Sequence, residues 1–281
     1  MVELTAEHLF HIYLKGTPLE TLALTDVSLT ITSDDFIAIM GKTGAGKSTF
    51  VQHFNGILKP SGGRVLIGGA DINGADKKLK HTVGLVFQFP ETQLFEENVF
   101  DDIAFGPRNL GWNEQTVREA VEEAVAAVDP TVSLLYAKSP FVLSGGEQRK
   151  VAICGIIAMR PQILCLDEPA AGLDPRSKEQ LFESLSRLHQ NGTGIVIITH
   201  DINDAVNYAH RVVIMHNGTC ACDVSVPRLL ASSEIVHEYG IAVPDSVLAM
   251  QYMPDLFASA GAITEKEIIS RLTAHARNEK T

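Results

Sequence analysis

The chain has 281 residues, 45% of them hydrophobic and 20% charged, which is typical of a globular protein with a large buried core. Lys and Arg number 23 against 34 Asp and Glu, a net charge of −11 that argues against nucleic acid as the main partner. No apolar run approaches the roughly 20 residues that span a bilayer, and no signal peptide is evident at the N-terminus. We therefore expect a cytoplasmic protein that could still dock on a membrane protein.

The N-terminal region predicts two strands, because residues 2–10 and 26–31 alternate weakly between apolar and polar side chains. Gly16 and Pro18 mark a loop at residues 11–20. Within it, Tyr13 could stack on an adenine, although a lone tyrosine is more often a packing residue.

A phosphate-binding loop is predicted at residues 41–48, between an apolar run at 36–40 and a helix-like segment at 49–58. Its glycines let successive N–H groups converge on one anion, and the following helix adds its positive end. Lys47 would reach the β- and γ-phosphates, and the Ser48 hydroxyl would ligate Mg²⁺. The alternative, a glycine-rich turn with a surface lysine, leaves the complete pattern unexplained. The candidate nucleotide-binding residues here are Gly41, Lys42, Thr43, Gly44, Ala45, Gly46, Lys47, Ser48 and Thr49.

Residues 83–87 predict a strand that ends at Gln88, and the composition changes after it. From 89 to 110, large apolar residues mix with acidic ones in a pattern that predicts neither a strand nor a long regular helix. Such a segment forms either internal packing or a groove for a partner's helix.

Two helices are predicted next. Asn113 caps one at about 114–128. Ser144 and Glu147 form a capping-box pattern that starts the other. Gly145 and Gly146 are unfavourable for helix stability in the first turn. They are suitable if the N–H groups of that turn must approach an anion closely, because glycine has no side chain to obstruct it.

Polar side chains follow several apolar strands. Residues 163–166 lead to Asp167 and Glu168, and residues 194–199 lead to His200. Strands alternating with helices predict an α/β fold with a mainly parallel sheet, which binds ligands at the carboxyl ends of its strands. The pattern weakens after about residue 226, where Thr264 and Glu267 predict the cap of a short last helix.

The order of these motifs resembles the ATP-binding-cassette ATPases over about residues 2–223. The resemblance implies a P-loop core with a mainly parallel sheet, an N-terminal antiparallel β subdomain and a small C-terminal extension. The cassette would span 1–225, with a helical subdomain inserted at about 89–158 and an accessory or dimerisation segment at 226–281. By the same resemblance, Gln88 is the Q-loop residue, Asp167 the Walker B carboxylate, residues 172–174 the D-loop and His200 the switch histidine.

The resemblance also implies site roles. Tyr13 would stack on adenine, and Glu168, His200, Gln88 and Lys47 would act in ATP hydrolysis. Mg²⁺ would lie among Ser48, Gln88 and Asp167. The signature residues would cap the γ-phosphate held by a facing subunit rather than by their own chain; they are Ser144, Gly145, Gly146 and Glu147.

Residues 87–97 and 102–107 look like the ATPase subunits of energy-coupling factor importers and their cobalt and nickel relatives. Residues 13–18 resemble one of two paralogous subtypes in the vitamin importers, which implies a heterodimer with a sister ATPase. The other partners would be a transmembrane coupling protein, docking near Gln88–Phe105, and a substrate-binding membrane protein. This places the chain peripherally on the cytoplasmic face of the membrane.

The function expected is therefore ATP-driven uptake of vitamins or other micronutrients, with a cobalt or nickel importer as the alternative. A soluble cassette protein of DNA repair or translation fits less well, because this chain has one cassette and no heptad insertion. A nucleotide sensor without turnover would not need Glu168 and His200. A small-molecule kinase would leave residues 143–147 unexplained.

Overall fold

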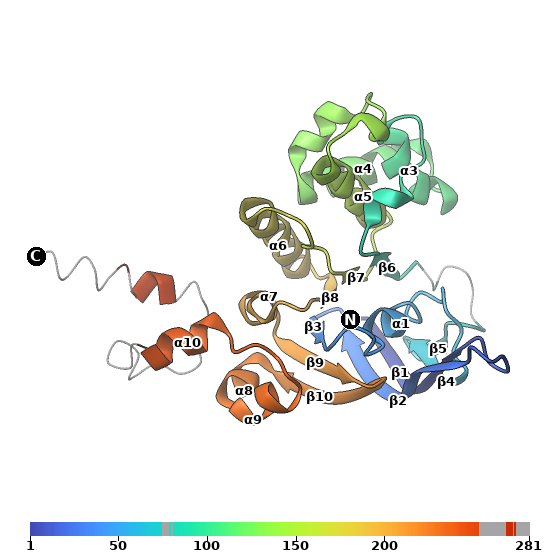
Figure 1. Cartoon of the computed structure of the whole chain (residues 1–281). Helices are drawn as coiled ribbons and strands as arrows, with labels where there is room; N and C mark the ends of the chain where they lie inside the picture. The colour runs from blue at the N-terminus through green and yellow to red at the C-terminus, as the bar shows by residue number, and fades with distance from the viewer. Residues whose placement is uncertain (75–78, 80, 253–267, 272, 274–281) are drawn as a thin grey trace, which may run out of the picture.

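The computed structural model describes residues 1–74, 79, 81–252, 268–271 and 273. Two sheets and a separate group of helices make up this part of the chain (Figure 1). Among the described helices, none combines the length and apolar character needed to cross a membrane. The predicted helix cap at Thr264 and Glu267 lies outside the described residues.

The first sheet is antiparallel, with strand order β2-β1-β4-β5. Its strands are β1 (Glu3–Tyr13), β2 (Thr21–Thr32), β4 (Gly62–Ile67) and β5 (Ala70–Asp71). Tyr13 pairs with Thr21, so the two long strands extend further than predicted and the loop shrinks to residues 14–20. Cross-strand pairing outweighs the turn signal of the sequence here, since it satisfies backbone groups on both strands.

The second sheet has the order β10-β9-β3-β8-β7-β6. Its strands are β3 (Phe36–Met40), β6 (Val83–Val86), β7 (Ile163–Asp167), β8 (Gly194–Ile198), β9 (Arg211–His216) and β10 (Thr219–Ser225). All run parallel except β10, which pairs antiparallel with β9. Every residue of β3, β7 and β8 is buried, as expected of strands covered on both faces. The predicted α/β fold with a mainly parallel sheet is confirmed.

The helix after the phosphate loop is shorter than predicted. It spans only α1 (Lys47–Val51), and turns replace the expected helix at residues 52–58. Gly56 takes a left-handed φ of +72°, which a continuing α-helix does not allow.

The group of helices comprises η1 (Pro90–Gln93), α3 (Val99–Asn109), α4 (Glu114–Val128), η2 (Pro130–Leu135), η3 (Pro140–Val142) and α5 (Gly145–Ile157). The irregular structure predicted for 89–110 holds only to residue 98. The Asn98 side chain accepts a hydrogen bond from the Asp101 N–H and starts a regular helix. Pro107 in the last turn of α3 hid this helix from sequence reasoning.

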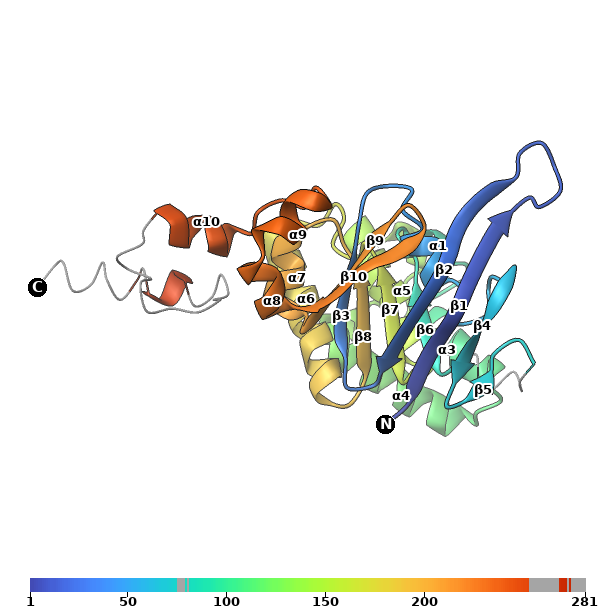
Figure 2. The ribbon, with the colours of Figure 1, turned by 90° about the horizontal axis from the view of Figure 1, so that it is seen from below.

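The remaining helices are α6 (Pro175–Gln190), α7 (Ile202–Tyr208), α8 (Val226–Ala231), α9 (Ser233–Glu238) and α10 (Asp245–Tyr252). Figure 2 shows α8 and α9 beside the strands β9 and β10, with α10 further out along the chain. The C-terminal helices therefore adjoin the antiparallel edge of the second sheet.

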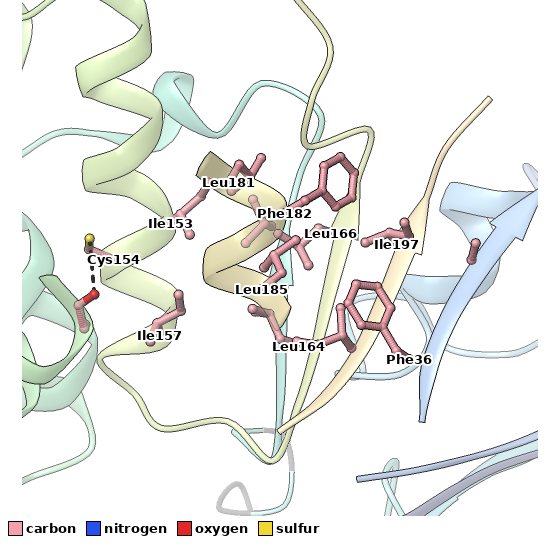
Figure 3. Packing of buried hydrophobic residues seen from close by; sticks show 14 of the residues in the cluster. Phe36, Ile153, Cys154, Ile157, Leu164, Leu166, Leu181, Phe182, Leu185 and Ile197 are labelled. Carbon is pink, nitrogen blue, oxygen red and sulfur yellow. Dashed lines mark hydrogen bonds between the residues drawn. The ribbon is translucent and has the colours of Figure 1, made fainter. Parts of the chain in front are cut away.

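One buried cluster joins the helices to the second sheet. Leu181 and Leu185 of α6 lie between Ile153 of α5 and Leu164 of β7 (Figure 3). At roughly 25 cal/mol per Å² of buried apolar surface, such side chains contribute about 1.5–3 kcal/mol each. The packing fixes where α5 begins relative to the ends of the strands.

Candidate functional site

The phosphate loop connects β3 to α1 and is held in shape by its own lysine. The Lys47 side chain is only 9% exposed, and its Nζ donates to the carbonyl oxygens of Gly41 at 2.8 Å and Lys42 at 3.1 Å. Gly41 has φ +144°, and a Cβ there would lie 2.2 Å from the Met215 carbonyl oxygen. The tight approach of β9 therefore allows no side chain at the start of the loop.

On the side where the strand β1 ends, Tyr13 reaches over α1. Its hydroxyl is 3.0 Å from the Thr49 Oγ1, and the residue is 37% exposed. The ring is thus fixed at one edge and open to solvent at another, as a platform for a planar base requires. Tyr13 and Thr49, both predicted nucleotide-binding residues, thus contact each other. The stacking of Tyr13 on adenine stays a prediction.

Two buried histidines lie beneath this platform. His53 has no solvent exposure; its Nδ1 is 2.7 Å from the Thr49 carbonyl oxygen, and its Nε2 is 3.1 Å from His11 Nδ1. The edge of the His11 ring faces Tyr13, with centroids 4.4 Å apart. Burial lowers the pKa of His11, and it lowers that of His53 to about 4.

The His53 environment predicts acid sensitivity. Between pH 6.5 and about 4, His53 is protonated in the unfolded chain but mostly neutral in the folded protein. The contribution of His53 to the free energy of unfolding is therefore highest above pH 6.5 and decreases as the pH falls toward about 4. Going from pH 7.5 to pH 5 costs about 2 kcal/mol through this residue alone. We expect His53→Gln to remove about that much of the pH dependence of the free energy of unfolding, measured by urea titration at both pH values. The exposed His81→Gln serves as control; equal pH dependence in all three proteins would contradict the expectation.

The predicted polar residues meet where parallel strands end. Gln88 follows β6, Asp167 ends β7, Glu168 comes next and His200 follows β8. Gln88 Nε2 donates to Glu168 Oε2 at 3.3 Å, and His200 Nδ1 lies 3.4 Å from Glu168 Oε1. Glu168 has a φ of +46°, an uncommon backbone conformation for a residue with a side chain, and such residues are enriched at functional sites.

The charges near the phosphate loop are removed from water. Burial lowers the pKa of Lys47, and the negative charges of Glu168 and Asp167 oppose that shift. Burial raises the pKa of Asp167, although the Ser48 hydroxyl donates a hydrogen bond to its carboxylate. The Asp167 carboxylate and the Ser48 hydroxyl are oxygen donors of the kind that Mg²⁺ prefers, so these residues fit a metal site at this point.

A cavity of about 880 Å³ brings these groups together. Its lining includes Tyr13, Gln88, Asp167, Glu168, His200 and every predicted residue of 41–49 except Ala45, which is buried in the core beneath the loop. Sequence reasoning missed the other lining residues, which are 21–23, Met40 and, between α9 and α10, residues 239–242. Gly240 with Pro244 signalled only a loop there, and nothing in the local sequence indicated that it would cross the site.

The predicted signature residues are well formed but lie elsewhere. Ser144 and Glu147 make the complete capping box at the start of α5. Together with Gly146 they line a separate hollow of about 550 Å³ between α5 and α6. The chain therefore does not bring these residues to its own phosphate loop.

A scan against protein families finds the ABC transporter family over residues 24–171, which is more than half of the chain. The chain belongs to the ABC transporter family. This chain is similar to the ATP-binding proteins of energy-coupling factor transporters over most of their length. The protein of this kind from Clostridium perfringens, EcfA2, is 43% identical over 244 residues, 85% of each chain. That of Acetivibrio thermocellus is 43% identical over 249 residues, 88% of each chain.

Solved structures of ABC ATPases have the same fold as this chain. CbiO1 of Clostridium perfringens, described as part of the ABC transporter complex cbiONQ, is 34% identical with a TM-score of 0.73, covering 88% of this chain and 98% of that one. The dimeric cassette MJ0796 in a post-hydrolysis state with ADP and phosphate is 26% identical with a TM-score of 0.69, covering 80% and 99%. The predictions of an ABC ATPase and of a likeness to energy-coupling factor ATPases are confirmed.

Proposed function

We propose that this ABC ATPase powers a micronutrient importer of the energy-coupling factor type, and that ATP closes two cassettes on one another. The observation that carries the proposal is the convergence of Gln88, Glu168 and His200 beside the phosphate loop. It supplies a base, a sensor of the γ-phosphate and a binding loop within one cavity. The likeness to the EcfA2 proteins supports the transport role.

Mg²⁺ fits the donors at the ends of β6 and β7. Among the described residues no group of three or more His, Cys, Asp or Glu could hold a metal ion. Mg²⁺ bound to a nucleotide needs only one or two protein ligands besides phosphate and water. Ser48, Asp167 and Gln88 would hold it, and its charge would offset that of the phosphates.

The chain's own residues then divide the work of hydrolysis. Lys47 exchanges its two loop carbonyls for phosphate oxygens and stabilises the negative charge that develops on them. Glu168 orients the attacking water and takes its proton, which is worth about 10²- to 10⁴-fold in rate. His200, 73% exposed at the mouth of the cavity, contacts the γ-phosphate from the opposite side.

The signature residues complete the site of a facing cassette. The first turn of α5 carries two exposed glycines, Gly145 and Gly146, and the first N–H groups of a helix have no partner within it, so they can bind an anion. Ser144 and these N–H groups would bind the γ-phosphate on the other subunit, a paralogous ATPase or a second copy. ATP then favours the closed pair and hydrolysis releases it, because only ATP binds both halves.

The Q-loop region offers a surface for a transmembrane coupling protein. Phe89, Phe95 and Phe105 are all at least 40% exposed, and the rings of Phe95 and Phe105 meet edge to face at 4.6 Å. Exposed aromatic pairs of this kind are typical anchors for a partner helix. A substrate-binding membrane protein would select the cargo, and the chain would sit on the cytoplasmic face of the membrane.

The proposed domain organisation follows the same division. Residues 1–225 form the cassette, residues about 89–158 its inserted helical subdomain, and 226–281 the accessory segment. Vitamin uptake is the favoured role and cobalt or nickel uptake the second candidate, as the sequence resemblance implies. The likeness to EcfA2 and CbiO1 supports a transport ATPase in either case.

Replacing both Phe95 and Phe105 with Ser is expected to separate the chain from its membrane partner. Loss of two aromatic anchors weakens association by at least about thirtyfold. ATP hydrolysis by the isolated chain should change less than about twofold, since neither ring lines the nucleotide cavity. Co-purification from membranes, with mass spectrometric identification of the subunits, measures the first effect.

The exposed Leu134→Ser variant, in the same group of helices, is the matched control. It should retain the membrane partner. Recovery of no integral membrane protein with the unaltered chain would contradict the importer role, and equal recovery with all variants would contradict the docking surface.

A further inference from the structure

Residues 239–245 comprise the link between α9 and α10 and the first residue of α10, and residues 239–242 line the nucleotide cavity; we call residues 239–245 the strap. It begins with a turn at residues 239–240, and its alternate residues Tyr239, Ile241 and Val243 pack on the main core cluster. Gly240 and Ala242 face outward between them, and residues 239–242 line the cavity. The strap is therefore anchored by apolar contacts and presents its intervening backbone to the site.

One end of the strap contacts the phosphate loop. Gly240 has a left-handed φ of +62°, and a Cβ there would lie 3.4 Å from Cε and 3.6 Å from Nζ of Lys42. The Lys42 carbonyl oxygen is one of the two that hold Lys47 Nζ. Beside it, the rings of Tyr239 and His216 meet with centroids 5.9 Å apart. The strap therefore lies against the side chain of Lys42, a residue of the phosphate loop.

The other end is hydrogen-bonded to the first turn of α7, three residues after His200. Asn203 Nδ2 donates to Asp245 Oδ2 at 3.0 Å, and the Asp245 N–H donates to Asn203 Oδ1 at 3.0 Å. Asn203 lies in the first turn of α7, whose N-cap is Asp201, the residue after His200. Figure 1 shows the chain between α9 and α10 running past α7.

We propose that the strap is a positioning element of the nucleotide site that ties the phosphate loop to the His200 loop. The proposal rests on the ATPase function above and extends it. Because the strap contacts Lys42 and is clamped at Asn203, it sets the spacing between the two loops on either side of the γ-phosphate. Nucleotide bound to both loops in turn restrains the strap. The effect of binding is thereby transmitted from the site to the C-terminal segment.

The Asn203–Asp245 clamp allows a test with its own rescue. Asn203→Ala removes both hydrogen bonds, and Asp245→Ala removes the one that its carboxylate accepts. Each variant should weaken ATP binding, by about three- to tenfold for Asn203→Ala. Turnover at saturating ATP should also fall, because His200 loses its fixed position. The double variant Asn203→Asp with Asp245→Asn exchanges donor and acceptor, keeps both hydrogen bonds and the local charge, and should restore both values.

Glu234→Ala, exposed on α9 and outside the strap, is the control. Single variants that bind and hydrolyse ATP like the unaltered chain would overturn the proposal. So would a double variant that stays as impaired as the single ones.

Hydrogen exchange adds a readout that a merely structural strap would not change. A non-hydrolysable ATP analogue should slow exchange of the 239–245 amides several-fold in the unaltered full-length chain, and much less in Asp245→Ala. Unchanged exchange while the analogue binds would overturn the strap proposal alone. Absence of analogue binding to the unaltered chain would overturn the proposed ATPase function, and the strap proposal with it.

Discussion

Glu168→Gln is expected to slow ATP hydrolysis at least about a hundredfold while ATP binding remains within a few-fold of normal. An amide has nearly the shape of the carboxylate, so it can keep the contacts with Gln88 and His200. It cannot accept the proton of the attacking water. Steady-state phosphate release and equilibrium binding of ATP measure the two effects separately.

The same variant should hold its dimer closed. With ATP bound and not hydrolysed, the anion that joins the two cassettes persists, so a stable dimer should accumulate with ATP and dissociate with ADP. Glu179→Gln, exposed on α6, controls for loss of a surface charge. Hydrolysis at the normal rate in Glu168→Gln would refute the assignment of the base.

Lys47→Ala should abolish measurable nucleotide binding, with affinity lower by at least about a hundredfold. Charge-assisted hydrogen bonds contribute about 1.5–3 kcal/mol each, and Lys47 can offer more than one to the phosphates. Its buried ammonium is already desolvated, so binding incurs little further cost of removing it from water. Titration with a fluorescent nucleotide measures the loss, and Lys59→Ala, an exposed lysine, is the control.

An unfolded variant would mimic this result, because Lys47 also links two loop carbonyls. Circular dichroism and the unfolding midpoint must therefore match those of the unaltered chain. A folded Lys47→Ala protein that binds nucleotide normally would contradict the role given to the loop.

The phosphate loop and the strand ends were predictable because their chemistry is local. The glycines, Lys47 and Ser48 of the phosphate loop all lie within eight consecutive residues, 41–48, so the sequence alone shows the pattern. Carboxylates such as Asp167 at the end of an apolar strand need a cation or hydrogen bonds, and parallel strands bring their ends together. The contacts among Gln88, Glu168 and His200 also need β6, β7 and β8 to be neighbours in the sheet, and the structure shows this order.

The features that were missed depend on contacts between distant segments. Residues 239–242 reach the cavity because α8 and α9 turn the chain back beside β9, which no local pattern records. The buried contact of His53 with His11 joins residues 42 positions apart. The helix α3 was obscured by Pro107 in its last turn, whereas packing against α4 and α5 stabilises it.

The central claim is that the signature residues of one cassette act on the nucleotide of the other. Complementation in tagged, purified mixed dimers tests it directly, with Lys47→Ala in one chain and Ser144→Arg in its partner. If the signature acts across the interface, both defects fall in one site, the second site is intact, and ATP hydrolysis rises well above that of either parent dimer. Mixed dimers as inactive as both parents would contradict the account.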